Sequence, residues 1–225
     1  MKTRQTILRA AAEVFDEVGF SAAAVRRIIK RARVTQGAMY FHFASKEDLA
    51  REVMFSQADD LVLPGGPDGL QRLIDITFYL ARELRTNPVL RGGVRLAVEQ
   101  GAFGMREERP YQQWADVFQE QLNAARERGE LADAVDVQEV SWVLVSAFSG
   151  MQLFSQITTG REDLPYRIST LWRYLLPGVA SGKARESLRL DLDMDQGRDP
   201  DPVPAPDADR DLDSREPHEG SGRPR

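Results

Sequence analysis

Apolar residues recur at helical spacing over most of residues 1–180, and this periodicity restricts what the chain can fold into. In the first segment, apolar residues occur at the i, i+3, i+4 spacing that places side chains on one helix face. These residues are Ile7, Leu8, Ala11, Val14, Phe15 and Val18. No alternating pattern typical of a half-buried strand competes with it. The chain has 225 residues, of which 42% are hydrophobic, enough for a sizeable core. We therefore predict an all-α fold.

Capping residues and helix breakers divide the first part of this pattern into short helices. Gly19 is suited to end the first helix, because glycine adopts the left-handed conformation found just after helices. Side chains that can cap the following helices are Ser21 for the second, Thr35 for a third over about 36–43, and Ser45 with Asp48 for a fourth over about 46–62. The sequence that ends the fourth helix is Pro64-Gly65-Gly66-Pro67.

Longer helices are predicted beyond this break, over about 68–86, 88–103, 109–129, 135–159 and 162–176. Pro177 and Gly178 are expected to end the last of them. One helix carries an a/d seam, with steps of three and four residues between Val137, Val140, Leu144, Ala147, Met151 and Phe154. Such a seam is suited to packing against another helix, and we expect the last two helices to form a homodimer interface with their symmetry mates.

Charge is distributed unevenly along the chain. The net charge is −5, yet residues 21–46 contain no acidic residue and six basic ones, namely Arg26, Arg27, Lys30, Arg31, Arg33 and Lys46. A local excess of this kind is typical of a segment that contacts nucleic acid, although a solvated helix face is the alternative. Residues 183–225 instead hold 8 basic and 12 acidic residues, and six of the twelve prolines. We predict that residues 181–225 form a disordered, acidic, proline-rich tail.

The second and third predicted helices, joined by a three-residue turn, have the arrangement of a helix-turn-helix motif. A short third helix can enter the major groove of DNA while the second crosses the backbone. The segment VTQGAMYFHFASKEDLA resembles the recognition-helix signature of the TetR family of bacterial repressors. This resemblance implies a dimer that binds a partly palindromic operator in double-stranded DNA. It places the DNA contacts at Arg27, Thr35, Gln36, Gly37, Tyr40, His42 and Lys46.

Roles within this set follow from chemistry and position. Gln36 and Gly37 are expected nearest the base edges, whereas Tyr40, His42 and Lys46 are expected at phosphates. A phosphate would explain a cation at the first position of the fourth helix, where the helix dipole disfavours it. The alternative that His42 is an ordinary surface residue stays open. The aromatic and apolar neighbours Met39, Phe41 and Phe43 are predicted to be core residues.

A second, narrower resemblance covers residues 87–176. The segments NPVLRGGVRLAVEQG, RPYQQW and FSGMQLFSQITTGREDL are similar to the γ-butyrolactone receptors of Streptomyces and their relatives. The resemblance implies a small lactone-type signalling molecule as effector and control of secondary metabolism. It places ligand-binding residues at Trp114, Gln57 and Ser149, the last where relatives often carry threonine. Weaker candidates are Gln152, Tyr111 and Thr159.

Alternatives remain at this stage. Trp114 can instead be a core residue, and Gln57 and Ser149 can be unrelated to ligand. A related regulator that senses an antibiotic, a furan or a butenolide is the alternative function. The predicted division is a DNA-binding domain over 1–46 and a ligand-binding and dimerisation domain over 47–180, with the fourth helix as the connection.

Other function classes are disfavoured by composition. The chain has no cysteine and two histidines, His42 and His218, neither suited to a Ser-His-Asp arrangement. No ExxH pattern suggests a metal site, and no metal site, catalytic residue or cofactor is expected. A pure interaction protein would have no use for a +6 segment without acids. No apolar run reaches the ~20 residues of a membrane helix, so we expect a cytoplasmic protein.

Overall fold

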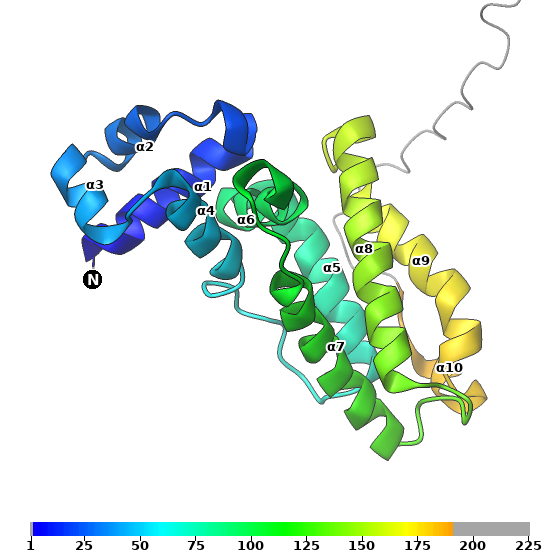
Figure 1. The fold of residues 1–225 in the computed structure, drawn as a ribbon. Helices are drawn as coiled ribbons and strands as arrows, with labels where there is room; N and C mark the ends of the chain where they lie inside the picture. The colour runs from blue at the N-terminus through cyan, green and yellow to red at the C-terminus, as the bar shows by residue number, and fades with distance from the viewer. Residues whose placement is uncertain (1, 191–225) are drawn as a thin grey trace, which may run out of the picture. The chain divides into compact units, whose positions relative to one another are not determined.

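A computed structural model describes residues 2–190, which are almost entirely helical (Figure 1). They contain one isolated β-bridge, between Leu131 and Ala180, and no strand. The prediction of an all-α fold is therefore confirmed. The helices are α1 (Lys2–Ala22), α2 (Val25–Ala32), α3 (Gln36–His42), α4 (Lys46–Phe55), α5 (Leu70–Thr86), α6 (Pro88–Val98), the 3₁₀ helix η1 (Gln100–Phe103), α7 (Arg109–Glu127), α8 (Val137–Thr159), α9 (Leu164–Val179) and α10 (Gly182–Ser187).

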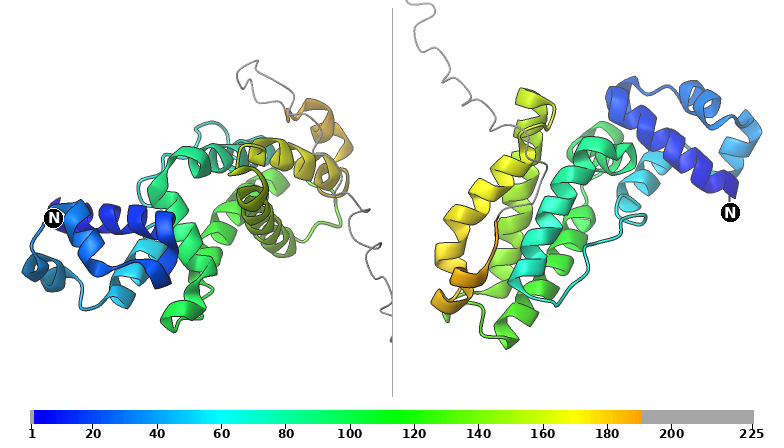
Figure 2. Two further views of the ribbon diagram at one scale, coloured as in Figure 1. Left: turned by 90° about the horizontal axis from the view of Figure 1, so that it is seen from above. Right: turned by 180° about the vertical axis from the view of Figure 1, so that it is seen from behind.

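Two hydrophobic cores meet at α6. One core joins α1 to α4 with the end of α6, and includes Phe15, Met54 and Leu96. The other joins α5, α7, α8 and α9 with the beginning of α6, and includes Leu90 and Trp172. The views in Figures 1 and 2 show α6 between the short N-terminal helices and the longer helices that follow. Any displacement of α6 is therefore felt by both cores.

Two adjacent glycines let α6 approach the N-terminal helices closely. A Cβ atom on Gly92 would lie 2.3 Å from the backbone oxygen of Ala12 in α1. On Gly93 it would lie 2.4 Å from the Cβ of Gln57 and 3.2 Å from the backbone oxygen of Val53 in α4. Real Cβ atoms do not approach other atoms this closely, so both positions require glycine.

Polar contacts continue this junction along the next turns of α6. Arg91 forms an ion pair of 2.8 Å with Asp16 of α1. Arg95 donates to the backbone oxygen of Asp16 at 2.7 Å and pairs with Glu99 at 2.8 Å. Glu99 in turn accepts a 2.7 Å hydrogen bond from the backbone N–H of Phe20. These contacts, one helical turn apart, hold α1 and α6 in one register.

Capping predictions in the N-terminal part are confirmed except for Ser21. The hydroxyl of Thr35 accepts from the N–H of Ala38 at 3.1 Å, and that of Ser45 accepts from Asp48 at 3.0 Å. Gly19 breaks the first helix with φ +73°, but a short helical segment continues to Ala22. Ser21 therefore lies in α1, and α2 begins after Ala24 without a side-chain cap.

Three predicted helix ends are wrong. The helix predicted over 88–103 ends at Val98, and the separate 3₁₀ helix η1 follows it. The fourth helix ends at Phe55 rather than near residue 62, and turns follow it. The last long helix continues through Pro177 to Val179. Proline has no backbone N–H to donate, but the N–H groups of later residues still form the hydrogen bonds of the final turn. The N–H of Ala180, for example, donates to the oxygen of Leu176 at 2.9 Å.

The predicted tail begins too early. Residues 181–190 are ordered: α10 forms, and the N–H of Ser181 donates to the oxygen of Glu130 at 2.8 Å. The backbone of Arg189 makes two hydrogen bonds, of 2.9 and 3.2 Å, with the amide of Gln71. Leu188 also packs against the larger core, so apolar contacts that composition alone hid stabilise this segment. The rest of the predicted tail, 191–225, lies outside the described residues.

Helix α8 is long and apolar enough, by length and composition, to cross a membrane. Polar residues such as Glu139, Ser146 and Gln152 interrupt it, so it is no uninterrupted apolar run, and one such helix is weak evidence for a membrane span. Only 28% of its most apolar stretch is buried. Its exposed apolar side chains are Val143, Leu153, Phe154 and Ile157. Within residues 2–190 these side chains stay largely exposed, although the guanidinium of Arg167 lies over the Phe154 ring at 4.6 Å.

Candidate DNA-binding face and ligand cavity

Helix α3 has one buried and one exposed face. Met39 is fully buried, and Phe43 just after the helix is 1% exposed, which confirms both as core residues. Phe41 is 84% exposed, so its prediction as a core residue is wrong. The reason is geometric, because positions 39 and 43 share one helix face and position 41 lies away from it. The exposed residues of α3 and its cap are Thr35, Gln36, Gly37, Tyr40 and Phe41.

Acidic residues of α1 neutralise part of the basic segment. Arg27 forms an ion pair with Glu17, and Arg31 pairs with Glu17 at 2.5 Å and with Glu13 at 3.8 Å. The hydrogen bond from Arg31 holds the pKa of Glu17 below its usual value. Exposed pairs of this kind are weak, so a phosphate can replace Glu17 as the partner of Arg27.

Three exposed cations on or beside α2 form no ion pair within residues 2–190. They are Arg26, Lys30 and Arg33. They remain available to a polyanion. The basic segment predicted from the sequence therefore carries fewer unpaired charges on α2 and α3 than its composition indicates.

Lys46 already has partners inside the protein. Its Nζ donates to the backbone oxygens of Phe20 and Ala23 at 2.9 and 3.1 Å, and it lies 4.2 Å from the centre of the Phe20 ring. These carbonyls lie at the end of α1, and they account for a cation at the start of α4 without a phosphate. One N–H of the ammonium group remains for a further acceptor. His42 is half-buried, with its ring edge-on to Phe41 at 5.1 Å.

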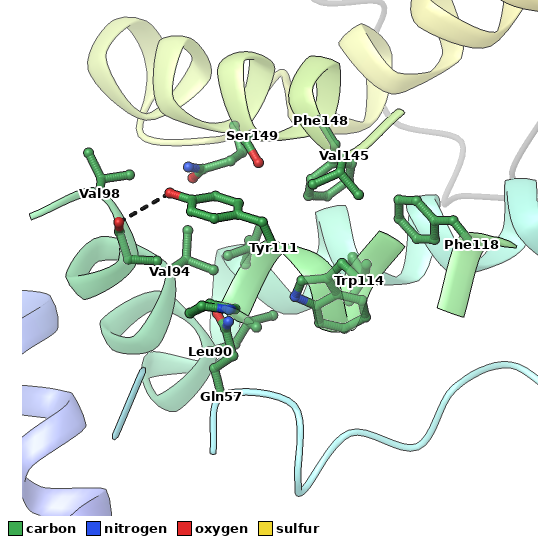
Figure 3. Close-up of a pocket in the computed structure, with 15 residues that line it drawn as sticks. Gln57, Leu90, Val94, Val98, Tyr111, Trp114, Phe118, Val145, Phe148 and Ser149 are labelled. Atoms are coloured by element: carbon green, nitrogen blue, oxygen red, sulfur yellow. Dashed lines mark hydrogen bonds between the residues drawn. The ribbon is translucent and has the colours of Figure 1, made fainter. Parts of the chain in front are cut away.

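A cavity lies between α5, α6, α7 and α8, closed on one side by the segment after α4 (Figure 3). Its volume is about 50 Å³. Ligand pockets usually have about 300 Å³ or more, so an effector has to displace some of the lining. Most of the wall is apolar and consists of Leu80, Leu84, Leu90, Val94, Ala97, Val98, Pro110, Phe118, Val145 and Phe148.

Five polar or amphipathic residues complete the lining, and three of them are the predicted ligand residues Trp114, Gln57 and Ser149. The others are Tyr111 and Gln152, which were weaker candidates. Figure 3 shows Gln57, from the segment after α4, and Tyr111 and Trp114, both from α7, turned toward the same space. The hydroxyl of Tyr111 donates to the oxygen of Ala97 at 3.1 Å, and burial raises its pKa. This anchors α7 to α6 inside the cavity.

Two sequence-based positions need correction. Gln57 was placed on the fourth helix but lies two residues beyond its end, 4% exposed and against Gly93. Thr159 does not line the cavity, because its hydroxyl bonds to the oxygen of Ser155 and to Asp163 at the end of α8. Phe148 and Arg161 were not predicted for this region. Nothing in the sequence pattern distinguishes Phe148 from any other apolar residue of α8.

Two family matches cover most of the described chain. Residues 7–53 match the family described as "Bacterial regulatory proteins, tetR family". Residues 68–181 match the family described as "Tetracyclin repressor-like, C-terminal domain". The chain belongs to the tetR family. The first match spans the helix-turn-helix segment, and the second contains every cavity-lining residue except Gln57, so this member combines the two sites described above. It is a helix-turn-helix transcriptional regulator.

Individual relatives narrow the comparison. The A-factor receptor protein of Streptomyces griseus is 38% identical over 180 residues, which are 80% of this chain and 64% of that protein. A crystal structure of TylP, a tetR regulator from Streptomyces fradiae, is 41% identical with a TM-score of 0.76, covering 84% of this chain and 92% of TylP. A structure titled γ-butyrolactone receptor (ArpA-like protein) is 32% identical with a TM-score of 0.63, covering 83% and 92%. The chain is thus related to γ-butyrolactone receptors.

Proposed function

We propose that the protein is a homodimeric repressor that a γ-butyrolactone-type molecule releases from its operator. One observation carries the proposal: α6 borders the cavity on one side and α1 on the other. Leu90 and Val94 line the cavity, whereas Gly92 and Arg95 contact α1. A ligand that enlarges the cavity therefore acts directly on the helix that supports the DNA-binding face.

The cavity chemistry suits a small amphipathic lactone. Its apolar wall accommodates an alkyl chain. The indole of Trp114 offers a flat apolar surface and one N–H donor, and Gln57 and Ser149 add polar groups on other sides. The likeness to proteins named as A-factor and γ-butyrolactone receptors supports the same class of ligand. The same regulator sensing a furan, a butenolide or an antibiotic is the alternative.

The dimer is proposed from the uncovered face of α8. Its exposed side chains include Phe154 at 56% and Ile157 at 73%, and Tyr166 and Tyr174 are exposed on α9, which contacts α8. Large apolar side chains gathered on two neighbouring helices are typical of an interface. A second copy packed on α8 and α9 would cover it as a four-helix bundle. Burial against a symmetry mate also explains the apolar composition of α8 without a membrane.

The proposed mechanism is linkage between two sites. In the dimer, the two α3 helices must lie about one DNA turn apart, roughly 34–36 Å, to enter successive major grooves. Ligand favours a larger cavity and a shifted α6, which changes that separation. Ligand and DNA must then weaken each other's binding by the same factor. A coupling of ~1–3 kcal/mol is typical of such systems.

The first test is a gel shift with DNA from upstream of the protein's own gene, with and without an organic extract of the producer's culture. A specific shift that the extract reverses supports a ligand-released repressor. A specific shift that the extract leaves intact favours the alternative ligand classes. Absence of any shift at low salt on this DNA, and on duplexes selected from a random pool, would contradict the DNA-binding role.

Substitution of Trp114 tests the ligand site. We expect Trp114→Ala to bind operator normally but to resist release by ligand, because the flat wall and the N–H donor are lost together. Trp114→Phe retains a flat wall without the donor and should respond at an intermediate ligand concentration. Release of the Trp114→Ala complex at the wild-type concentration would assign Trp114 to the core.

A further inference from the structure

The turn between α8 and α9 holds a buried arginine behind the cavity. Arg161 is 4% exposed, and its Nη2 donates to the Oε1 of Gln152 at 3.2 Å. Gln152 is itself 3% exposed and lines the cavity. The Nε of Arg161 is buried without a hydrogen-bond partner in the described chain. Arginine is rarely buried unless it is paired, so this placement needs an explanation.

The backbone at this turn is specialised for placing the side chain. Gly160 and Arg161 both have positive φ, of +64° and +73°. The N–H of Arg161 reaches back to the oxygen of Ser155 at 3.1 Å, and that of Gly160 reaches Gln156 at 3.2 Å, which closes the end of α8. A left-handed conformation is unfavourable for arginine. The cost is tolerated only where the surroundings determine the position of the residue.

The charge of Arg161 persists at neutral pH. Burial lowers its pKa to about 10, and Asp16 of α1 opposes that shift. Asp16 is already paired with Arg91, and Arg95 lies nearby as well. Arg161 therefore has no carboxylate of its own within residues 2–190, and the oxygen of Gln152 is its hydrogen-bond acceptor there.

This contact determines which end of the Gln152 amide faces the cavity. With Oε1 bonded to Arg161, the remaining polar atom is Nε2, and it donates to no group among residues 2–190. An amide nitrogen can only donate. Because Gln152 lines the cavity, its Nε2 is the amide atom left to donate to a ligand there, in a wall that is otherwise largely apolar.

We propose that Gln152 is the acceptor-binding subsite of the cavity and that Arg161 is its positioning residue. The subsite takes a carbonyl oxygen, such as that of a lactone ring, through the Nε2 of Gln152. Arg161 prevents the amide from turning its oxygen toward the ligand. This inference rests on the proposed function, because it specifies one contact within the proposed ligand site.

The experiment compares two probes that differ by one carbonyl group. γ-Decalactone and 2-hexyltetrahydrofuran have the same ring size and the same alkyl chain, and only the lactone has the carbonyl oxygen. Binding of each probe to the full-length protein is measured by calorimetry. We expect the wild-type protein to prefer the lactone by about tenfold, the value of one hydrogen bond. The preference should vanish in Gln152→Leu and fall severalfold in Arg161→Met.

Arg167→Met is the matched control. Arg167 lies at the same corner, pairs with Asp163 at 2.6 Å and does not line the cavity. It should keep the wild-type preference for the lactone. Each variant is also tested for operator binding, so a folding defect is seen separately. Gln152→Glu is the second variant, because its carboxylate would pair with Arg161 and should reject the lactone carbonyl.

Each outcome decides one part of the inference. An unchanged preference in Gln152→Leu overturns the subsite, and an unchanged preference in Arg161→Met overturns the positioning role alone. A wild-type protein that binds operator but prefers neither probe overturns the subsite while leaving the repressor role intact. A wild-type protein that binds lactone with the expected preference but no DNA contradicts the proposed function instead.

Discussion

At the scale of the residue, Lys46 illustrates how one side chain can serve the fold and still be available to DNA. Two of its three donors bond to carbonyls at the end of α1. The ammonium therefore joins the start of α4 to the break at Gly19. A phosphate contact through the third donor remains a prediction. Loss of Lys46 must then be measured on stability and on DNA binding separately.

We expect Lys46→Ala to lower the free energy of unfolding by about 1–3 kcal/mol, because charged hydrogen bonds to buried carbonyls are lost. We also expect weaker binding to all DNA sequences and a salt slope that is shallower by about one unit. Lys30→Ala is the comparison, since Lys30 is exposed and should affect only DNA binding. A normal salt slope in Lys46→Ala would remove Lys46 from the phosphate contacts.

Phe41 is the residue whose environment was predicted least accurately from the sequence. Its neighbours in α3 are apolar, and only the helical register shows that it faces solvent. It shares the exposed face of α3 with Gln36, Gly37 and Tyr40. In a major groove, a phenylalanine there can contact the methyl group of thymine.

Phe41→Ala should therefore weaken operator binding while changing stability by less than about 0.5 kcal/mol, because no packed core is disturbed. Met39→Ala, two residues away and fully buried, should instead destabilise the fold by about 2–5 kcal/mol. Thermal unfolding and operator titration separate the two effects. Equal operator affinity in Phe41→Ala and wild type would place Phe41 outside the DNA contact.

At the scale of the element, helices were well predicted where their caps and apolar faces depend only on residues nearby in the sequence. Thr35 and Ser45 cap their helices as expected because a cap depends on neighbours three residues away. Ends set by tertiary contacts were not. The helix ending at Phe55 and the ordered residues 181–190 depend on packing partners far along the chain, which no local pattern reveals.

The glycine pair of α6 gives a prediction at this scale. Gly92→Ala should destabilise the protein by at least about 1–3 kcal/mol, because the new Cβ atom meets backbone and cannot be accommodated by a rotamer change. Gly178→Ala in α9 is the control, since nothing lies within 4 Å of its Cβ position. Chemical denaturation of both variants checks this. Equal stability of Gly92→Ala and the wild-type protein would mean that α1 and α6 can move apart without a loss of stability.

At the scale of the whole molecule, the candidate sites were predictable as residues but not as an arrangement. The motif resemblances named Trp114, Gln57 and Ser149, which the fold brings to one cavity. They did not reveal Arg161, because a buried arginine and an exposed one have the same local sequence signature. Nor did they show that α6 contributes to both cores.

The dimer gives the prediction at this scale. Ile157→Glu should shift the protein toward monomers at micromolar concentration and weaken operator binding, because a charge would be buried at the proposed interface. Val62→Glu is the matched control, since Val62 is 82% exposed and belongs to the segment between α4 and α5, outside the proposed interface helices. Sedimentation equilibrium measures the assembly. A dimer of unchanged strength in Ile157→Glu would place the interface elsewhere.

The close approach of α6 to α1 and α4 also limits how regulators of this kind can be recombined. A chimaera that exchanges residues 1–60 for those of another regulator replaces Ala12, Val53 and Gln57, but keeps Gly92 and Gly93. The grafted helices must bring equally small surfaces to that seam, or the new DNA specificity will not be connected to the old effector. Compatibility across a few ångströms of helix backbone, rather than the length of the linker, would then decide which exchanges yield a responsive switch.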